Sequence, residues 1–145
     1  MKALVFGMGL QGKAVVHDLE GSDIVTAVTV AELDVPQAEA WLARRGCRKT
    51  KVVALDAEAP GAVDRLVQAE RPNVIVSMLP PPFQPVLARA AVDAGVPYAS
   101  SSYAGALTEL DAAARERGVA LLPEMGMDPG IDLVLGRLAV DELDV

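Results

Sequence analysis

Three glycines near the amino terminus, Gly7, Gly9 and Gly12, have the spacing G-x-G-x-x-G. An apolar run typical of a strand precedes them, and a helical pattern begins at Leu10. In this context the first glycine permits a tight turn, the second lets the backbone approach a pyrophosphate, and the third lets the helix pack closely. Free N–H groups at the start of the helix attract phosphate oxygens. The following loop residues therefore predict a site for the pyrophosphate of NAD or NADP: Gly7, Met8, Gly9, Leu10, Gln11 and Gly12.

A carboxylate follows at the distance expected for a dinucleotide site. Glu32 lies twenty residues after Gly12, at the end of the second predicted strand. A carboxylate there accepts hydrogen bonds from the adenosine ribose and repels a 2′-phosphate, which favours NAD over NADP. Asp34 is a competing candidate for this role. Cations that could serve a 2′-phosphate come only late in the next helix or beyond it: Arg44, Arg45, Arg48 and Lys49.

Polar residues also fall where other predicted strands end, and ligands of parallel α/β sheets bind beyond those ends. Asp56 follows the third strand, where it could meet the adenine amino group; the alternatives are a helix N-cap or a solvated loop carboxylate. The end of the fourth strand and the segment after it contain Ser77, Leu79 and Pro80. We expect these residues to pass near the nicotinamide ribose and to offer backbone groups. The alternative for this segment is a strand exit enforced only by proline.

Apolar runs alternate with helical patterns along the chain and place these residues in a fold. The predicted strands are 3–6, 24–30, 51–55, 73–78, 98–100 and 119–122. A final helical pattern puts four apolar residues on one face: Ile131, Val134, Leu135 and Leu138. Short strands buried on both faces, with helices between them, indicate a parallel sheet covered on both sides. We predict a doubly wound (Rossmann) α/β fold of about six strands in the order 3-2-1-4-5-6.

Composition restricts the class of protein. The 145 residues suit one domain, and a chain that is 52% hydrophobic but 3% aromatic must fill its core with Ala, Val and Leu. A net charge of −7 argues against a nucleic-acid or anionic-membrane partner. The single cysteine, Cys47, cannot form an internal disulfide and fits a reducing compartment. No apolar run approaches the ~18 residues of a membrane span, so we expect a cytoplasmic protein.

Four segments together resemble one family, the amino-terminal domain of saccharopine dehydrogenases of the saccharopine reductase type and their lysine-dehydrogenase-like relatives. They are Val5 to Gly12, Val76 to Pro81, Ser101 to Tyr103, and Glu124 to Asp132. The last segment is the most distinctive, because it fits the pattern E-x-G-x-D-P-G-x-D. The resemblance implies reduction of an imine, or oxidation of the matching amine, with NAD or NADP. Saccharopine, lysine and carboxynorspermidine are substrates that it suggests.

The same resemblance assigns roles to three residues. Ser102, Tyr103 and Asp128 would face the substrate side of the nicotinamide. Asp128 would orient a substrate ammonium group, and Tyr103 would bind a carboxylate or flank the nicotinamide. The alternative is structural, because Asp128 could cap a helix whose first position is Pro129, with Gly130 allowing close approach.

The family pattern extends beyond this chain. Family members are longer, and their second domain supplies most substrate contacts. We therefore expect residues 1–145 to be the dinucleotide-binding domain, without the substrate domain, and to bind cofactor with little catalysis alone. The alternative is a regulatory nucleotide-sensing module like those attached to potassium transporters. An unpaired sheet edge or an exposed apolar final helix would favour a homodimer.

Overall fold

The computed structural model describes residues 1–143 and contains one six-stranded sheet. All neighbouring strands pair in parallel, in the order β3-β2-β1-β4-β5-β6. The strands are β1 (Lys2–Phe6), β2 (Ala27–Glu32), β3 (Thr50–Ala54), β4 (Val74–Ser77), β5 (Tyr98–Ser100) and β6 (Leu121–Leu122). The doubly wound order predicted from the alternating pattern is confirmed.

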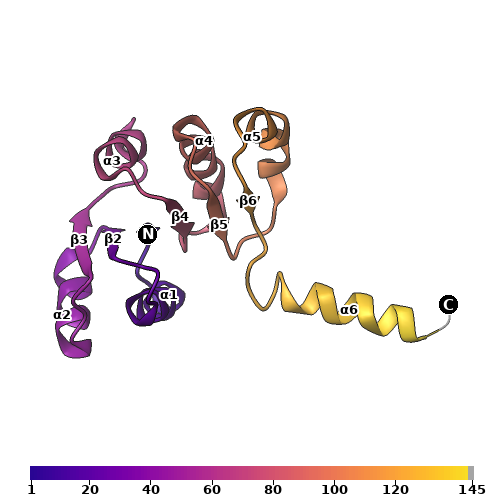
Figure 1. Ribbon diagram of the computed structural model, residues 1–145, viewed down its shortest axis with the longest axis horizontal. Coiled ribbons are helices and arrows are strands. Elements are labelled where there is room, and N and C mark those ends of the chain that lie inside the picture. Colours follow the sequence, from indigo (N-terminus) through magenta and orange to yellow (C-terminus); the bar gives the residue numbers. More distant parts are fainter. Residues whose placement is uncertain (144–145) are drawn as a thin grey trace.

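Helices cover both faces of the sheet, as a parallel sheet requires. These helices are α1 (Leu10–Gly21), α2 (Val35–Arg45), α3 (Ala62–Glu70), α4 (Gln84–Ala94) and α5 (Asp111–Arg117), with 3₁₀ turns η1 (Pro81–Phe83) and η2 (Gly105–Leu110). A sixth helix, α6 (Ile131–Glu142), follows the last strand. Figure 1 shows α1 and α2 on one face and α3, α4 and α5 on the other. The connection from β3 to β4 brings the chain to the other side of β1, so the sheet's switch point lies between β1 and β4, and the glycine loop follows β1 there.

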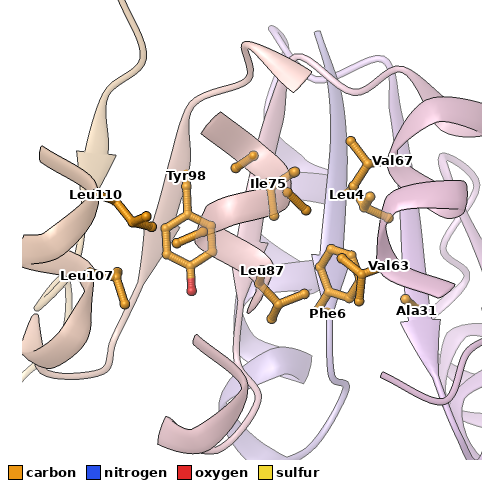
Figure 2. Close-up of a cluster of buried hydrophobic side chains, with 13 residues drawn as sticks. Leu4, Phe6, Ala31, Val63, Val67, Ile75, Leu87, Tyr98, Leu107 and Leu110 are labelled. Carbon is orange, nitrogen blue, oxygen red and sulfur yellow. The ribbon is translucent and has the colours of Figure 1, made fainter. Parts of the chain in front are cut away.

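Side chains of β1 alternate between two separate cores. Val5 packs with Val16 of α1 and Leu42 of α2. Leu4 and Phe6 point to the opposite face. There they join a larger cluster whose other labelled members in Figure 2 come from β2, α3, α4, β4, β5 and η2: Ala31, Val63, Val67, Leu87, Ile75, Tyr98, Leu107 and Leu110. These clusters fix the strands whose carboxyl ends carry the candidate site.

Some element boundaries differ from those predicted. β2 begins at Ala27 rather than Ile24, because the Val25 amide bonds to the Ser22 carbonyl in a turn and the Thr26 amide bonds to Met1. The last strand shrinks from 119–122 to two residues. The apolar residues at the ends of these predicted strands thus lie in turns or loops. The hydrophobic pattern alone does not distinguish such residues from strand residues.

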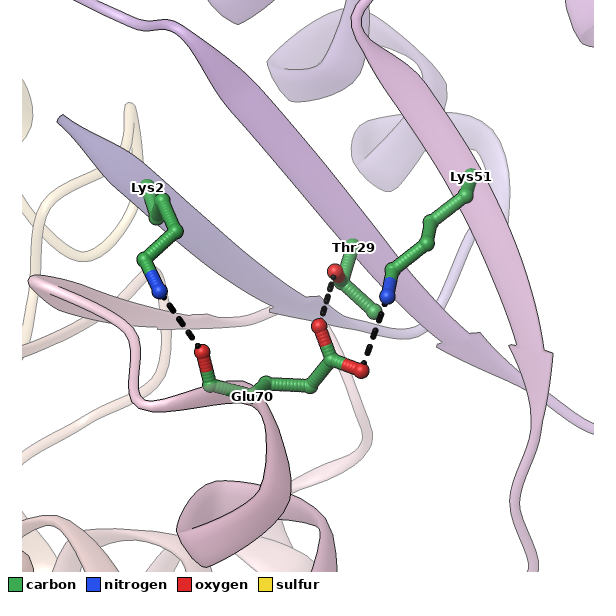
Figure 3. Close-up of polar contacts among 4 residues, drawn as sticks. All are labelled: Lys2, Thr29, Lys51 and Glu70. Atoms are coloured by element: carbon green, nitrogen blue, oxygen red, sulfur yellow. Dashed lines mark hydrogen bonds and ion pairs between the residues drawn. The ribbon is translucent and has the colours of Figure 1, made fainter.

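A polar cluster ties α3 to the amino ends of the strands, opposite the glycine loop. The Glu70 carboxylate accepts hydrogen bonds from the Thr29 hydroxyl (2.8 Å) and the Lys51 ammonium (2.9 Å). Lys2 donates to the Glu70 carbonyl oxygen at 3.1 Å (Figure 3). The hydrogen bond from Lys51 lowers the pKa of Glu70, and Thr29 adds to this against the opposing effect of burial.

α6 extends away from the sheet (Figure 1). Within the described chain no residue of α6 is buried, and the four apolar residues predicted to share a face, such as Leu135 and Leu138, are all exposed. A helix that is apolar and unburied leaves its hydrophobic surface free for contact. Among residues 1–143, no helix is long and apolar enough to cross a membrane.

Candidate functional site

The glycine loop has a conformation that requires glycine at two of its three positions. Gly7 has φ +88°, which L side chains rarely adopt, and its N–H donates to the Ala31 carbonyl at 3.0 Å. A Cβ on Gly12 would lie 3.0 Å from the Gly7 carbonyl carbon and closer still to its oxygen. Gly12 therefore lets α1 start directly against the loop, as the sequence pattern predicts.

Gly9 is different, because a Cβ there would meet no atom within 4 Å. It is the N-cap of α1, and no described side chain caps that end of the helix. Leu10 is 89% exposed and Gln11 is also exposed, so the first turn of α1 opens to solvent. Open space beside free helical N–H groups fits a pyrophosphate, which needs close backbone approach and hydrogen-bond donors.

Glu32, at the end of β2, faces this loop. Its Oε2 accepts a hydrogen bond from the Met8 amide at 2.6 Å, and its Oε1 accepts one from Leu33 at 2.8 Å. The Met8 side chain is buried, so only its backbone belongs to the loop surface. The competing carboxylate, Asp34, instead caps α2 by accepting from the Gln37 amide at 3.0 Å. Of the two candidates, Glu32 is the one directed at the glycine loop.

A pocket of about 400 Å³ lies beside Glu32. It is lined by Ala31, Glu32, Leu33, Leu55, Asp56, Ala57, Glu58, Leu79, Pro80 and Phe83. Three of these residues are carboxylates, and among the described residues that line it none is Lys or Arg. Asp56 accepts a hydrogen bond from the Glu58 amide at 2.9 Å, whereas the N-cap of α3 is Gly61, so Asp56 is not a helix cap. We call this space the acidic pocket.

The three residues predicted at the end of β4 do not share one environment, because Ser77 is buried whereas Leu79 and Pro80 line the acidic pocket. Ser77 is 1% exposed and pairs within the sheet with Phe6 and Ser100, so its side chain does not reach the surface. Leu79 and Pro80 line the acidic pocket. The structure therefore groups Leu79 and Pro80 with Glu32, and their expected contact with the nicotinamide ribose stays a prediction.

The turn after β5 lies on the other side of the glycine loop. The Ser101 hydroxyl bonds to the Gln11 side-chain oxygen at 3.2 Å. The Ser102 carbonyl accepts from the Glu124 amide at 2.9 Å, which connects this turn to the segment after β6. The Tyr103 hydroxyl donates to Asp128 Oδ1 at 2.8 Å. Two candidate residues that are 25 positions apart in sequence thus meet directly.

The helix-cap alternative for Asp128 is wrong. α6 begins at Ile131 after Gly130, and the carboxylate that serves its first turn is Asp132, which accepts from the Gly130 amide at 2.7 Å. Pro129 accordingly lies before the helix and not in its first position. The hydrogen bond to Asp128 and the charge of that carboxylate raise the pKa of Tyr103. Gly130 has φ +146°, and a Cβ there would lie 2.6 Å from the Glu124 carbonyl oxygen, which fits the expected close approach.

Sequence reasoning overlooked three residues that the fold brings to this edge. Glu58 and Phe83 line the acidic pocket, and Ser101 contacts the glycine loop. Ser101 is next to the candidate Ser102 in the sequence, and Glu58 lies two positions after the candidate Asp56. Phe83 had no signal beyond its place after three prolines, because most of its pocket neighbours follow β2 and β3.

Comparisons with known proteins identify the relatives of this chain. The family model described as "Saccharopine dehydrogenase NADP binding domain" matches residues 3–122. The saccharopine dehydrogenase [NADP(+), L-glutamate-forming] of Saccharomyces cerevisiae is 29% identical over 97% of this chain, which spans 30% of that protein. The mitochondrial alpha-aminoadipic semialdehyde synthase of Rattus norvegicus is 32% identical over 50% of this chain and 8% of its own length. The chain thus spans less than a third of these curated relatives.

Solved structures agree with the sequence matches. Apo saccharopine dehydrogenase (L-Glu forming) from Saccharomyces cerevisiae superposes with a TM-score of 0.82 at 29% identity, covering 97% of this chain and 31% of that one. GenD2 from gentamicin A biosynthesis, in complex with NAD, has a TM-score of 0.65 at 22% identity, covering 85% and 34%. The second likeness concerns the fold alone. The family match favours an oxidoreductase domain over the regulatory module considered as its alternative.

Proposed function

Because the chain belongs to the family of saccharopine dehydrogenase NADP-binding domains, we propose that it serves an oxidoreductase acting on a C–N bond. The bond would belong to an amino acid or a polyamine-type secondary amine. We propose further, from the charges of its site and in contrast to the cofactor in the family's name, that it prefers NAD to NADP. The observation that carries the cofactor preference is the acidic pocket, with three carboxylates and no cation among its described lining residues.

The preference follows from charge. A 2′-phosphate on the adenosine ribose would bring negative charge beside Glu32, Asp56 and Glu58. Sites that accept this phosphate supply an arginine or other cation to neutralise it. The cations considered from the sequence, such as Arg44 and Arg45, lie in the last turn of α2, at the end distant from Glu32. Glu32 has oxygen lone pairs left for the ribose hydroxyls of NAD, even while it accepts from Met8 and Leu33.

The remaining residues would contact different parts of the dinucleotide. The open space at Gly9 and the free first turn of α1 would receive the pyrophosphate. Leu33, Leu79 and Phe83 would give the adenine an apolar surface within the acidic pocket. The nicotinamide would then lie toward the Gln11 and Ser101 side of the loop.

Tyr103 and Asp128 support the assignment to amine chemistry. When bound, the nicotinamide supplies hydride transfer, and the protein supplies orientation and charge. The Asp128 carboxylate, held by Tyr103, is exposed and can attract a substrate ammonium group. Ser102 keeps this turn in place through its carbonyl. The amine itself would be a small cationic metabolite, in keeping with the amino-acid substrates that the relatives' names state.

Comparative titration with NADH and NADPH tests the cofactor preference. We expect the wild-type chain to bind NADH at least about tenfold more tightly than NADPH. Cofactor fluorescence or calorimetry measures both affinities. Glu32→Ala should narrow that ratio, because the repelling carboxylate is gone. Glu39→Ala, which removes an exposed carboxylate of α2 outside the pocket, is the matched control and should leave the ratio unchanged. An unchanged ratio in Glu32→Ala would show that Glu32 does not read the ribose.

Two further expectations accompany this function. A chain with a single cysteine fits the reducing environment of the cytoplasm. The homodimer expected from an exposed apolar final helix stays a prediction. The exposed leucines of α6, Leu135 and Leu138, are the residues to substitute. Sedimentation should give a dimer for the wild type and a monomer for the double variant Leu135→Asp, Leu138→Asp. A monomeric wild type would contradict the expected homodimer.

A further inference from the structure

Four buried polar residues lie directly beneath the candidate dinucleotide site. Gln84 at the start of α4 is 2% exposed, and Tyr98 of β5 is fully buried. Ser77 and Ser100 pair in register on neighbouring strands and are also buried. Buried polar groups are costly unless they make hydrogen bonds, so such a cluster in an otherwise aliphatic core calls for a physical reason.

Gln84 and Tyr98 make the described side-chain hydrogen bonds of this cluster, which lead to the exit of β4, whereas the Ser77 and Ser100 hydroxyls have no described partner. The Gln84 side-chain amide donates to the Leu79 carbonyl at 2.5 Å and approaches the Pro80 carbonyl at 3.4 Å. The Tyr98 hydroxyl donates to Gln84 Oε1. The two carbonyls select the amide orientation, because they only accept and so require the NH₂ group. That leaves Oε1 of Gln84 to accept from the Tyr98 hydroxyl. Burial raises the pKa of Tyr98, which keeps the donor proton in place.

The segment that Gln84 holds has few other attachments. Pro80, Pro81 and Pro82 have no N–H group, so they cannot donate to neighbouring backbone. The described backbone bonds nearest to the segment are from the Met78 amide to Phe6 and from the Phe83 amide to Pro80. Without the Gln84 amide, the Leu79 carbonyl would lose its described donor.

This segment also separates the two halves of the site. Leu79 packs on the glycine loop, since a Cβ on Gly7 would lie 2.8 Å from Leu79 Cδ2. Leu79 and Pro80 then form one wall of the acidic pocket opposite Glu32. A shift of this segment would therefore change the glycine loop and the pocket together.

We infer that Gln84, held in place by its hydrogen bond from Tyr98, is a positioning residue for dinucleotide binding: it fixes the Leu79–Pro80 segment between the glycine loop and the acidic pocket. Figure 2 shows Tyr98 standing between β5 and the leucines of η2, where packing on Leu107 and Leu110 holds its ring. The core thereby holds in place a segment whose three prolines donate no backbone hydrogen bonds. The inference rests on the proposed site for the dinucleotide.

Gln84→Met tests the inference with an apolar side chain of similar length. We expect NADH to bind about tenfold more weakly, the effect of losing one well-placed hydrogen bond in the site's support. Val92→Ala is the control, because Val92 is buried in the same helix but packs with Ala114 and Val119. It should lower thermal stability and change NADH affinity less than about twofold. Equal losses of affinity in both variants would overturn the inference.

Gln84→Glu adds a readout that a merely structural role would not move. An ionised carboxylate has no donor for the Leu79 carbonyl, whereas a protonated one has. Burial raises the pKa of such a carboxyl, so NADH affinity of this variant should recover as pH falls from about 8.5 to about 6.5. The wild type, measured alongside, should show no such recovery. A Gln84→Glu chain with the wild-type pH dependence would contradict the role assigned to the amide.

Hydrogen exchange separates this inference from the proposed function. The Phe83 amide, bonded to Pro80 in the free chain, should exchange faster in Gln84→Met than in the wild type or Val92→Ala. If the wild type binds neither NADH nor NADPH, the proposed function fails while Phe83 exchange still decides whether Gln84 holds the segment. Unchanged Phe83 exchange in Gln84→Met would refute the positioning role whatever the affinity.

Discussion

Substitutions at two glycines of the loop, Gly9 and Gly12, should both weaken NADH binding, but only the substitution at Gly12 should also lower stability. A Cβ on Gly12 would be 3.0 Å from the carbonyl carbon of Gly7 and nearer to its oxygen, so backbone must move. A Cβ on Gly9 would meet nothing within 4 Å. Gly9 also has φ −66° and ψ −157°, extended backbone that valine adopts readily.

The magnitudes follow from these geometries. Gly12→Ala overpacks the contact between α1 and the loop, and overpacking of this kind costs about 1–3 kcal/mol. For a chain of this length that corresponds to a fall in Tm of roughly 3–10 °C. Gly9→Val should cost less than about 1 kcal/mol, mainly from a poorer N-cap residue. Its side chain would nevertheless fill the space where the pyrophosphate must approach, and should weaken NADH binding by about a hundredfold or more.

The assay pairs thermal unfolding with calorimetric titration of NADH. Gly9→Val should keep nearly the wild-type Tm and lose binding. Gly12→Ala should lose stability and, because Gly7 moves with it, binding as well. Wild-type affinity in Gly9→Val would refute the assignment of the open space at Gly9 to phosphate. Wild-type stability in Gly12→Ala would refute the steric argument.

Two further predictions concern ionisable groups at opposite ends of the sheet. Asp128→Asn should lower the pKa of Tyr103, because it removes the carboxylate that accepts the phenol proton and repels the phenolate. Phenolate absorbance during an alkaline titration measures this, with Tyr103→Phe identifying the transition, and an unmoved midpoint would exclude the contact. Glu70→Gln should lower stability by about 1 kcal/mol at neutral pH. Since the folded-state pKa of Glu70 is lowered, its stabilisation is present above the unfolded-state pKa and disappears as pH falls through the folded one. Denaturant unfolding of both proteins across the acid range checks this, and a difference that persists at low pH would contradict it.

The fold was predictable because its signals are local and periodic. The alternation of apolar runs with helical patterns is enough to indicate a doubly wound sheet, and the right-handed crossover rule orders the strands. The glycine spacing was equally informative, since the positive φ of Gly7 and the crowding at Gly12 leave few alternatives to glycine. Glu32 could be predicted as the ribose-binding carboxylate because it lies twenty residues after Gly12, at the end of the second predicted strand.

The parts that escaped prediction depend on contacts between distant segments. Whether Asp128 capped a helix or met Tyr103 depended on where α6 begins, and an Asp-Pro-Gly sequence is compatible with either. The acidic pocket joins residues from three loops, so Glu58 and Phe83 had no common pattern in the sequence. The support of Leu79 by Gln84 is likewise visible only once α4 lies beneath the β4 exit.

The most direct test of the dinucleotide site is to map NADH on the isotopically labelled chain by amide chemical shifts. The account predicts that NADH perturbs the amides of Gly7 to Gln11 together with Leu33 and Asp56 around the acidic pocket. Amides at the opposite edge, such as Lys2 and Lys51 beside Glu70, should stay unchanged. Saturable perturbations confined to that opposite edge, with the glycine loop unmoved, would contradict the account.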